Sequence, residues 1–524
     1  MKIDDHGLRC RALRLLRAVG AGLLAVAALC VAPAGAAHAS TTIAATSTSG
    51  FNLSLQADNS ATIAATLNAS RVALTPAMAE RPGKAGLCWP TPFNPGVGAN
   101  GYCWDSADDT GSNGWSPQGF SVPHDAAGDG RWNSVRWEVT SWHNSNDTQI
   151  RLRFTNRNTS PPTYADVALV VFSGSGVVQR AGHADGVTWY GDKLYIVSGR
   201  VLDIVDLGDL TAYPNVFAGF DYVLPVRYTY RTTSSPCVPA TGTTPCLNGV
   251  SFDRSRGALL TNEYYNADVA GGRLISWPLN LSTGLPAGTA QAAWTSPVHK
   301  MQGVTYDGAS FFISGLCPST YNNSYRQPAC VHKGAAGEAT SVLTQVPDMT
   351  QNLDWDASTG RVRGINEVHQ STEFLPQRLV FDFAPTARAI TVGRFRNVNS
   401  NMCVLPYAAS LNDGAYIVQA ACDGKSAQNW YWNGAEMRSF VSDRCMTVEG
   451  ASNAAGVHII QAACTNSAYQ RWTRVTGNGG AMLVNEGSGK CLVPYAGSKS
   501  SGANIMQGNC DATSRAYAWI GYTP

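Results

Sequence analysis

Polar residues recur at a fixed place in a repeated strand motif between residues 118 and 351. Each copy has a polar residue, usually followed by glycine, and then an apolar residue that opens a strand. The copies are "QGFS" at Gln118, "DGVT" at Asp185, "NGVS" at Asn248, "QGVT" at Gln302 and "QNLD" at Gln351. A carboxylate pair among such residues would suit glycoside hydrolysis, and a ring of carboxylates and amides would suit Ca²⁺. We favour a plainer interpretation, in which these side chains and trapped water satisfy one another's hydrogen bonds.

Four other polar residues near these motifs could join them. They are His183, Glu263, Asp354 and Glu367. The candidates for catalysis are Asp185, Glu263 and Glu367, because a glycosidase needs two carboxyl groups at a suitable separation. The sequence has no GxSxG, HExxH or GxxxxGK[ST] pattern and identifies no nucleophile. No Cys/His cluster indicates a metal site, so Ca²⁺ is the one ion that we consider.

The elements around these residues read as short strands and tight turns. "DGVTWYGDKLYIVSG" turns at Gly191–Asp192, and "QGVTYDGASFFISG" turns at Asp307–Gly308, both typical hairpin dipeptides. The motifs follow one another at intervals of 67, 63, 54 and 49 residues. Such spacing suits four-stranded blades. The sequence therefore predicts a five-bladed β-propeller over residues 86–385, with the leading polar residues around a central channel.

The N-terminus has the features of a secretory signal. Arg9, Arg11, Arg14 and Arg17 precede an apolar run, and small residues at Ala37 and Ala39 fit a signal-peptidase site. The apolar run is shorter than the roughly 20 residues that span a bilayer. We expect a bacterial-type signal peptide over residues 1–39, and hence a secreted protein. A Ser/Thr/Ala-rich stretch follows over residues 40–85, either as a weakly ordered arm or as strands that lie on something else.

The charge balance argues against two classes of partner. Residues 1–39 carry five of the 38 basic and two of the 36 acidic residues, so 33 basic residues remain against 34 acidic ones. A nearly neutral chain without a basic run lacks the electrostatic footprint of a nucleic-acid-binding protein. It also lacks the polybasic patch that would hold it on an anionic membrane.

Twelve cysteines follow the signal segment, and an exported chain is expected to pair them. The spacing suggests three local couples and three couples with identical separation. The local couples are Cys88/Cys103, Cys237/Cys246 and Cys317/Cys330; the others are Cys403/Cys422, Cys445/Cys464 and Cys491/Cys510.

A unit of 42 to 46 residues occurs three times at the C-terminus, beginning at Cys403, Cys445 and Cys491. Each copy repeats Ser, Gly, Ile, Gln and a second Cys at constant offsets. The repeated glutamines are Gln419, Gln461 and Gln507. Glycine, asparagine and serine interrupt every copy, which favours short strands over helices. Three such units close most simply as a β-trefoil over residues 390–523, so the whole chain is predicted to be all-β.

The repeat resembles the ricin B-type lectin domains, in which a QxW signature marks each lobe. "QNW" and "QRW" match it, and the third copy ends at a tryptophan without the glutamine. The matching residues are Gln428, Trp430, Gln470, Trp472 and Trp519. The resemblance implies that these residues belong to the core. The preceding region resembles secreted bacterial propeller-like proteins of unassigned function.

The same resemblance implies where sugar would bind, and this sequence departs from the pattern. The family's aspartate is replaced by Leu405, Thr447 and Val493, and its aromatic by Ala421, Ala463 and Asn509. The three repeated glutamines match the family. Tyr407 and Tyr495, each four residues after a first cysteine, offer replacement stacking surfaces.

We therefore expect a secreted, carbohydrate-binding recognition protein. It would bind a glycan or polysaccharide and no nucleic acid, and it would not span a membrane. The alternative is a secreted carbohydrate-active hydrolase, with its site in the propeller channel and the trefoil as binding module. The sequence does not specify the glycan or the oligomeric state.

Overall fold

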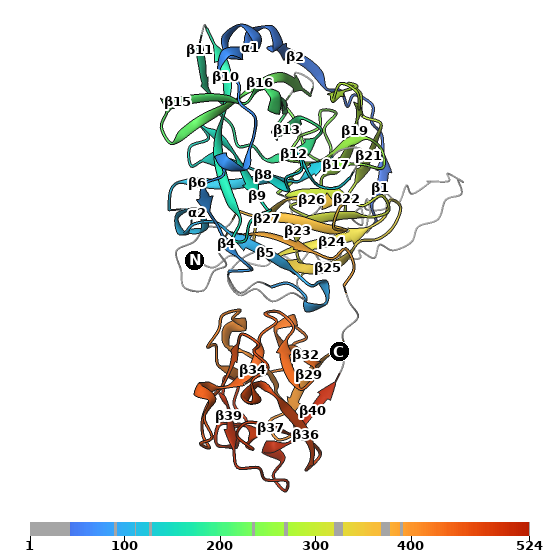
Figure 1. Cartoon of the computed structure of the whole chain (residues 1–524). Coiled ribbons are helices and arrows are strands. Elements are labelled where there is room, and N and C mark those ends of the chain that lie inside the picture. The colour runs from blue at the N-terminus through green and yellow to red at the C-terminus, as the bar shows by residue number, and fades with distance from the viewer. Residues whose placement is uncertain are drawn as a thin grey trace, which may run out of the picture. The chain divides into compact units, whose positions relative to one another are not determined.

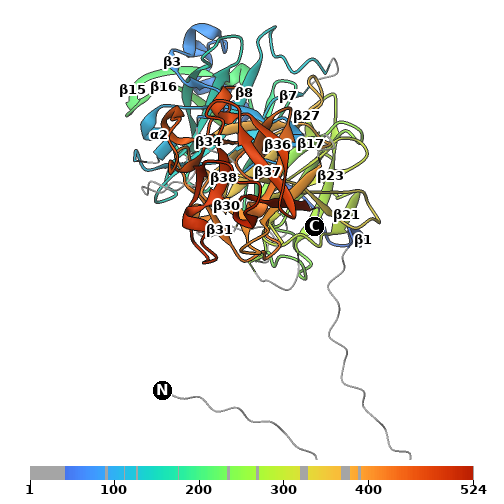
Figure 2. The same cartoon turned by 90° about the horizontal axis from the view of Figure 1, so that it is seen from below.

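The computed structural model describes residues 42–88, 92–110, 112–124, 128–174, 176–232, 236–266, 271–318, 328–367, 378–387 and 391–522. The expected signal peptide lies outside these ranges. The described residues form an all-β protein, as the sequence predicts (Figure 1, Figure 2). In these ranges, no helix is long and apolar enough to cross a membrane. Two parts are described separately below: the ring unit, residues 42–387, and the trefoil, residues 391–522.

The ring unit contains five antiparallel meanders of four strands. The first consists of β6 (Trp115–Ser121), β8 (Trp137–Asn144), β9 (Ile150–Asn156) and β10 (Thr163–Ser173). The second consists of β12 (Gly186–Tyr190), β13 (Lys193–Ser198), β14 (Val201–Asp206) and β16 (Phe220–Arg231). A parallel pairing of β10 with β16 joins these two meanders in one sheet.

The other three meanders each form a sheet of their own. The third consists of β17 (Gly249–Asp253), β18 (Ala258–Asn262), β19 (Arg273–Asn280) and β21 (Ala292–Thr295). The fourth consists of β22 (Gly303–Tyr306), β23 (Phe311–Leu316), β24 (Ala329–Gly334) and β25 (Ser341–Val346). The fifth takes β26 (Thr350–Asp356), β27 (Arg361–Asn366) and β28 (Val380–Phe383), and closes with β5 (Asn100–Cys103) from the start of the unit.

The first strands of the meanders form a closed cycle. β6 contacts β12, β12 contacts β17, β17 contacts β22, β22 contacts β26, and β26 contacts β6 again. Each of these strands begins within three residues of the leading polar residue of one repeated motif. Apolar side chains pack between neighbouring meanders, and Trp189, Leu259 and Phe381 are among the buried ones. β12, β17, β22 and β26 are labelled near the centre of this unit in Figure 1.

The Ser/Thr/Ala-rich stretch adds edge strands to these meanders, which is the second of the two expected forms. β1 (Ala44–Thr46) pairs with β21, β2 (Ser54–Asp58) with β16, β3 (Arg81–Pro82) with β10 and β4 (Lys84–Ala85) with β5. α1 (Ser60–Thr66) and α2 (Ser106–Thr110) are short. The remaining strands of the unit are β7 (Pro123–His124), β11 (Gly176–Gln179), β15 (Thr211–Phe217) and β20 (Leu285–Pro286).

The trefoil has twelve strands in three lobes of four. The first lobe contains β29 (Val392–Asn397), β30 (Cys403–Pro406), β31 (Ile417–Ala420) and β32 (Asn429–Asn433). The second contains β33 (Glu436–Ser439), β34 (Cys445–Val448), β35 (Ile459–Ala462) and β36 (Trp472–Gly477). The third contains β37 (Gly480–Asn485), β38 (Cys491–Pro494), β39 (Ile505–Gly508) and β40 (Trp519–Tyr522).

All six expected disulfides are present, with the predicted partners. In the ring unit the bonds join Cys88 to Cys103, Cys237 to Cys246 and Cys317 to Cys330. In the trefoil they join Cys403 to Cys422, Cys445 to Cys464 and Cys491 to Cys510, and each closes the same 19-residue segment of one lobe.

The spacing of the cysteines predicted their partners but not their burial. Cys330, on β24, is fully buried, and so is the first cysteine of each trefoil bond. The second cysteines lie nearer the surface: Cys422 and Cys464 are half-buried, and Cys510 is exposed. Each trefoil bond therefore ties a surface loop to a core strand, which is a structural role.

The three tryptophans of the signature are buried, and each indole donates a hydrogen bond to a main-chain carbonyl. The bonds run from Trp430 to Val404, from Trp472 to Met446 and from Trp519 to Leu492. The repeated sequence thus builds a repeated core.

Candidate functional site

The centre of the ring is filled by protein where an open channel was expected. Gly186 and Gly303 approach the next inner strand so closely that a Cβ would lie 2.7 Å from Val250 N and 2.6 Å from Asn352 Cα, respectively. Asn352 stands where the other motifs have glycine, and its side chain is fully buried. Its Nδ2 lies 3.0, 3.2 and 2.8 Å from the carbonyl oxygens of Phe120, Val187 and Val250, which come from three other inner strands. The Asn352 side chain of the fifth motif therefore fills the centre of the ring.

Six polar residues gather at the end of the ring where the inner strands begin, and we call them the polar mouth: Gln118, His143, His183, Asp185, Gln351 and Glu367. Gln351 Nε2 donates to Glu367 Oε2 at 2.7 Å. Gln118 also donates to Glu367, and its Nε2 lies 3.3 Å from His143 Nε2. The two glutamines of the motif thus orient one carboxylate.

Two imidazole rings lie against each other beside this carboxylate, with their planes tilted by 31°. The rings of His143 and His183 have centroids 4.0 Å apart. Each ring has its own aspartate: His183 Nδ1 lies 3.0 Å from Asp185 Oδ1, and His143 Nδ1 lies 2.5 Å from Asp147 Oδ1. The second oxygen of Asp185 accepts a hydrogen bond from Gly199 N at 3.1 Å. The mouth therefore contains several titratable groups in contact with one another.

The environment shifts the pKa values of these groups in different directions. Burial raises the pKa of Glu367 above its usual value, the charge of Asp185 adds to this, and the charge of His183 opposes it. The hydrogen bond to Asp185 raises the pKa of His183. Burial and the neighbouring His183 lower the pKa of His143. Perturbed groups that cluster in this way are a common property of functional sites.

A cavity of about 300 Å³ lies beside the mouth, at the entry to β22 and β26. Its walls include Gln302, Tyr264, Lys300 and Met349. Lys300 and Met349 have φ angles of 51° and 53°, which residues other than glycine rarely adopt. Asn248, the leading polar residue of the third motif, accepts a hydrogen bond from the backbone N of Tyr264 and so contacts the wall of this cavity. Backbone held in this region is often associated with function.

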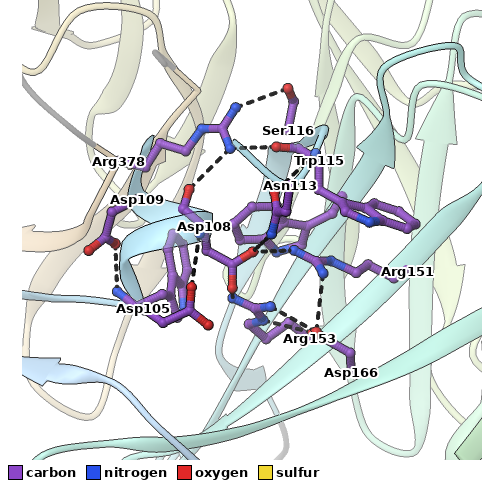
Figure 3. Close-up of polar contacts among 12 residues, drawn as sticks. Asp105, Asp108, Asp109, Asn113, Trp115, Ser116, Arg151, Arg153, Asp166 and Arg378 are labelled. Atoms are coloured by element: carbon purple, nitrogen blue, oxygen red, sulfur yellow. Dashed lines mark hydrogen bonds and ion pairs between the residues drawn. The ribbon is translucent and has the colours of Figure 1, made fainter. Parts of the chain in front are cut away.

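A network of buried ion pairs supports the mouth (Figure 3). Asp108 accepts Arg151 at 2.8 Å and pairs with Arg153 at 2.7 Å, and both arginines also pair with Asp166. Arg378 donates to the carbonyl oxygens of Glu367, Trp115 and Asp108. Through Arg378 the network fixes the main chain that carries Glu367.

Two of the expected site residues are structural. Glu263 is fully buried, and its two carboxylate oxygens accept from the Arg273 guanidinium at 2.7 Å each and from the backbone N of Ala240 and Cys246. Asp354 is also fully buried. It accepts from Ser121 Oγ at 2.7 Å and Val122 N at 2.9 Å, and it pairs with His124 at 3.0 Å. The carboxylate oxygens of Glu263 and Asp354 are thus bonded within the protein.

The repeated glutamines of the trefoil are also structural. Each is fully buried, and its amide group ties one lobe to the next. Gln461, for example, accepts from Ser442 Oγ and donates to the carbonyls of Ser410 and Asn412. Gln419 reaches the carbonyls of Ser498 and Ser500, and Gln507 those of Ser452 and Ala454. The amide groups of the three glutamines are thus bonded to the protein.

The trefoil tyrosines, by contrast, face solvent. Tyr407 and Tyr495 are 63% and 62% exposed, and they occupy the same turn of the first and third lobes. The second lobe has Glu449 there. Gln428 and Gln470 of the signature brace the loop of their own lobe, through bonds to Asp423 N and Ala421 O and to Thr465 N and Ala463 O.

His143 and Asp147 were missed by the sequence analysis. They lie on either side of the turn in "WHNSND" that joins β8 to β9. A histidine and an aspartate four residues apart across a tight turn were the available signal. Their proximity to His183 depends on how β8 packs against the loop before β12, which local sequence does not reveal.

Residues 391–519 match the family model of the ricin-type beta-trefoil lectin domain. The C-terminal part of the chain therefore contains a domain of this type, as the threefold repeat predicts. No curated protein matches the chain.

Solved structures similar to parts of the chain include lectins and an enzyme. The designed threefold protein ThreeFoil is 26% identical over 25% of this chain and 99% of its own, with a TM-score of 0.24. An exo-beta-1,3-galactanase from Clostridium thermocellum is 13% identical, and the match covers 78% of this chain and 99% of the galactanase chain, with a TM-score of 0.29. The C-half of the earthworm R-type lectin, in complex with GalNAc, is 15% identical, and the match covers 25% of this chain and 96% of the lectin chain, with a TM-score of 0.21.

Proposed function

We propose that this protein is a secreted carbohydrate-binding protein in which Tyr407 and Tyr495 of the trefoil contact the glycan. The observation that carries the proposal is the exposure of these two tyrosines, 63% and 62%, at one turn of a lectin-family fold. A tyrosine ring offers a flat apolar face and a hydroxyl, and therefore suits a ligand that is partly apolar and partly polar. The six disulfides and the N-terminal signal pattern support export.

The ring unit is, in this proposal, a five-bladed β-propeller that serves as scaffold. The closed cycle of five inner strands and the contribution of β5 to the last meander support this interpretation. The filled centre also favours a scaffold over a channel, because Asn352 occupies the position through which a ligand would pass.

The proposal is tested by presenting the full mature chain to a glycan array and to insoluble polysaccharides. We expect binding by the unchanged protein and its loss in Tyr407→Ala and Tyr495→Ala, each by about tenfold or more, or about 1.4 kcal/mol. Tyr407→Phe should retain binding, because it keeps the ring. Glu449→Ala is the matched control, since Glu449 occupies the same turn of the second lobe. Equal binding by the tyrosine variants and the unchanged protein would refute the assignment.

A second candidate function is glycoside hydrolysis at the polar mouth. The observation that favours it is the raised pKa of Glu367 beside Asp185, since a hydrolase needs one protonated and one ionised carboxyl group. Release of reducing sugar from a polysaccharide by the full chain, with loss of release in Asp185→Asn and Glu367→Gln, would support it. Absence of release from every substrate that the protein binds would count against it.

A further inference from the structure

Two histidines of the polar mouth and the neighbouring Asp147 form a set of side chains with the composition of a transition-metal site. His143, Asp147 and His183 each offer one ligand atom, and these three atoms lie within 4.8 Å of one another. Two imidazoles and one carboxylate are ligands of Zn²⁺ in proteins, with bonds of about 2.0–2.2 Å. Modest side-chain rotations would bring the three atoms to such distances, because Asp147 and His183 are 52% and 40% exposed and have room to turn.

These side chains come from the end of β8, the turn that follows it and the loop before β12, and the backbone joins these segments. His143 stands near the end of β8, and Asp147 lies in the turn that follows, with a φ of 57°. His183 lies in the loop before β12, between Gly182 (φ 147°) and Ala184 (φ 55°). Gly182 N donates to Asp147 O at 2.8 Å, so the turn and the loop are joined by a main-chain bond. Positive φ at Asp147 and Ala184 is the kind of strained backbone that persists where the surrounding structure requires it.

The outer partner of His183 fits the same interpretation. Metal-bound histidines usually donate their second ring nitrogen to a carboxylate, a carbonyl or water, which fixes the ring and raises its basicity. Asp185 Oδ1 lies 3.0 Å from His183 Nδ1, and Gly199 N holds the other oxygen of Asp185. This arrangement leaves Nε2 of His183 for an ion. On the other ring, the donor Nε2 of Gln118 lies 3.3 Å from Nε2 of His143, and Nδ1 of His143 lies 3.0 Å from Asn144 O and 2.5 Å from Asp147 Oδ1. Binding of an ion beside Asp147 would therefore displace the proton and the Asn144 contact at Nδ1.

The donor types decide which ion this set would prefer. Ca²⁺, the ion considered from the sequence, takes six to eight oxygen ligands. Two of the three donors here are imidazole nitrogens, and Asp147 supplies the one carboxylate. Imidazole nitrogen suits zinc, copper, iron and nickel. Three protein ligands would leave a further coordination position for water or a ligand oxygen, as in catalytic zinc sites.

We propose that His143, Asp147 and His183 bind one divalent transition-metal ion, with Zn²⁺ as the reference ion. This site belongs to the ring unit and does not depend on the trefoil tyrosines.

Isothermal titration of the chelator-treated full mature chain with ZnCl₂, and separately with CaCl₂, tests the proposal. We expect one Zn²⁺ per chain at micromolar or tighter affinity, and no comparable binding of Ca²⁺. His183→Ala should weaken Zn²⁺ binding by more than about 100-fold, since the loss of outer partners alone costs about 10–100-fold. Asp147→Asn should also weaken it, and Asp185→Asn should do so by about 10–100-fold.

His458→Ala is the matched control, because His458 in the trefoil also faces a carboxylate, that of Glu449 at 3.4 Å, and is similarly exposed. It should bind Zn²⁺ as the unchanged protein does. His183 and Asp147 are exposed enough for their variants to fold, and thermal unfolding without metal should show this directly. Substitution of Co²⁺ should give the intense visible absorption of a low-symmetry site, and His183→Ala should abolish it. Absence of Zn²⁺ binding, tighter binding of Ca²⁺ than of Zn²⁺, or undiminished binding by His183→Ala would overturn the proposal.

Discussion

Single buried charges decide much of the stability of the ring unit. Asp108 and Arg153 have fully buried side chains, and Arg151 and Asp166 are nearly so. Taking such charges out of water is costly, and the cost is offset only while every partner is present. The indoles of Trp142 and Trp115 flank Arg151 at 4.5 and 4.6 Å and add cation–π attraction. The network therefore ties α2, β9 and β10 to the segment that carries Arg378.

Asp108→Asn should destabilise the protein by about 3–5 kcal/mol, because the two buried guanidinium groups of Arg151 and Arg153 would then have Asp166 as their one shared carboxylate. The free energy of unfolding in urea measures this. Asp423→Asn is the control, since Asp423 pairs with Lys425 at 3.6 Å and both side chains are more than 40% exposed. Such exposed pairs contribute about 1 kcal/mol or less. Equal destabilisation by the two variants would show that the buried network has no special role.

The sequence pattern predicted the structural roles of some residues and not of others. Spacing revealed the cysteine pairs and the tryptophan cores, because both recur at fixed offsets in each lobe. Glu263 looked like a catalytic candidate because its partner, Arg273, stands ten residues away across a hairpin. Asn352 breaks the polar–glycine pattern of the other motifs, but its amide fills the space that the glycines leave. Both roles depend on contacts between strands, which the local pattern does not encode.

At the scale of elements, the trefoil lobes are coupled by one buried glutamine each. Gln461 of the second lobe holds residues Ser410 and Asn412 of the first, three to five residues after Tyr407. Gln507 of the third lobe holds the corresponding loop of the second, which has no tyrosine. The lobes are therefore related in structure but differ in what their loops present.

Gln461→Ala should lower the free energy of unfolding by about 2 kcal/mol or more, because two carbonyls and a hydroxyl lose their partner. It should also weaken glycan binding, since the loop after Tyr407 loses its anchor. Gln507→Ala should cost similar stability and leave glycan binding unchanged. Thermal unfolding and polysaccharide pulldown of the two variants, side by side, check this. Equal loss of binding in both would mean that the effect is general loosening of the domain.

The order of the strands along the chain could be predicted from the sequence, whereas many contacts between strands could not. The polar–glycine–apolar motif marked each inner strand, because close packing in the ring demands glycine there and a turn precedes it. The Ser/Thr/Ala-rich stretch was ambiguous, since β1, β2, β3 and β4 gain their stability from the edges of distant meanders. Pairings such as Ala44 with Thr295 join residues far apart in sequence. No local pattern specifies such an edge.

At the scale of the whole molecule, buried carboxylates set the response to acid. Burial alone would raise the pKa of Asp108, but Arg153 and Arg151 outweigh it and hold this pKa below its usual value. The same two arginines outweigh burial at Asp166 and lower its pKa as well. At Asp356, Arg363 and the hydroxyl of Ser358 outweigh burial in the same way. A folded-state pKa below the unfolded one means that the unfolded state binds more protons as the pH falls.

The stabilisation from these groups should therefore be fully present above the unfolded pKa of about 4 and lost progressively as the pH falls below it. The melting temperature measured from pH 7 to pH 2 should fall steeply below about pH 4. Asp108→Asn should show a shallower fall, because one of the linked groups is gone. A melting temperature that is constant through this range would contradict the assignment.

The central claim is that the exposed tyrosines of the trefoil, and not the polar mouth, hold the glycan. The most direct test is the affinity of the full mature chain for one bound oligosaccharide, measured by isothermal titration in three proteins. These are the unchanged protein, Tyr407→Ala/Tyr495→Ala, and Asp185→Asn/Glu367→Gln. We predict loss of measurable binding in the tyrosine variant and unchanged affinity in the mouth variant. The reverse pattern would contradict the account and move the function to the ring unit.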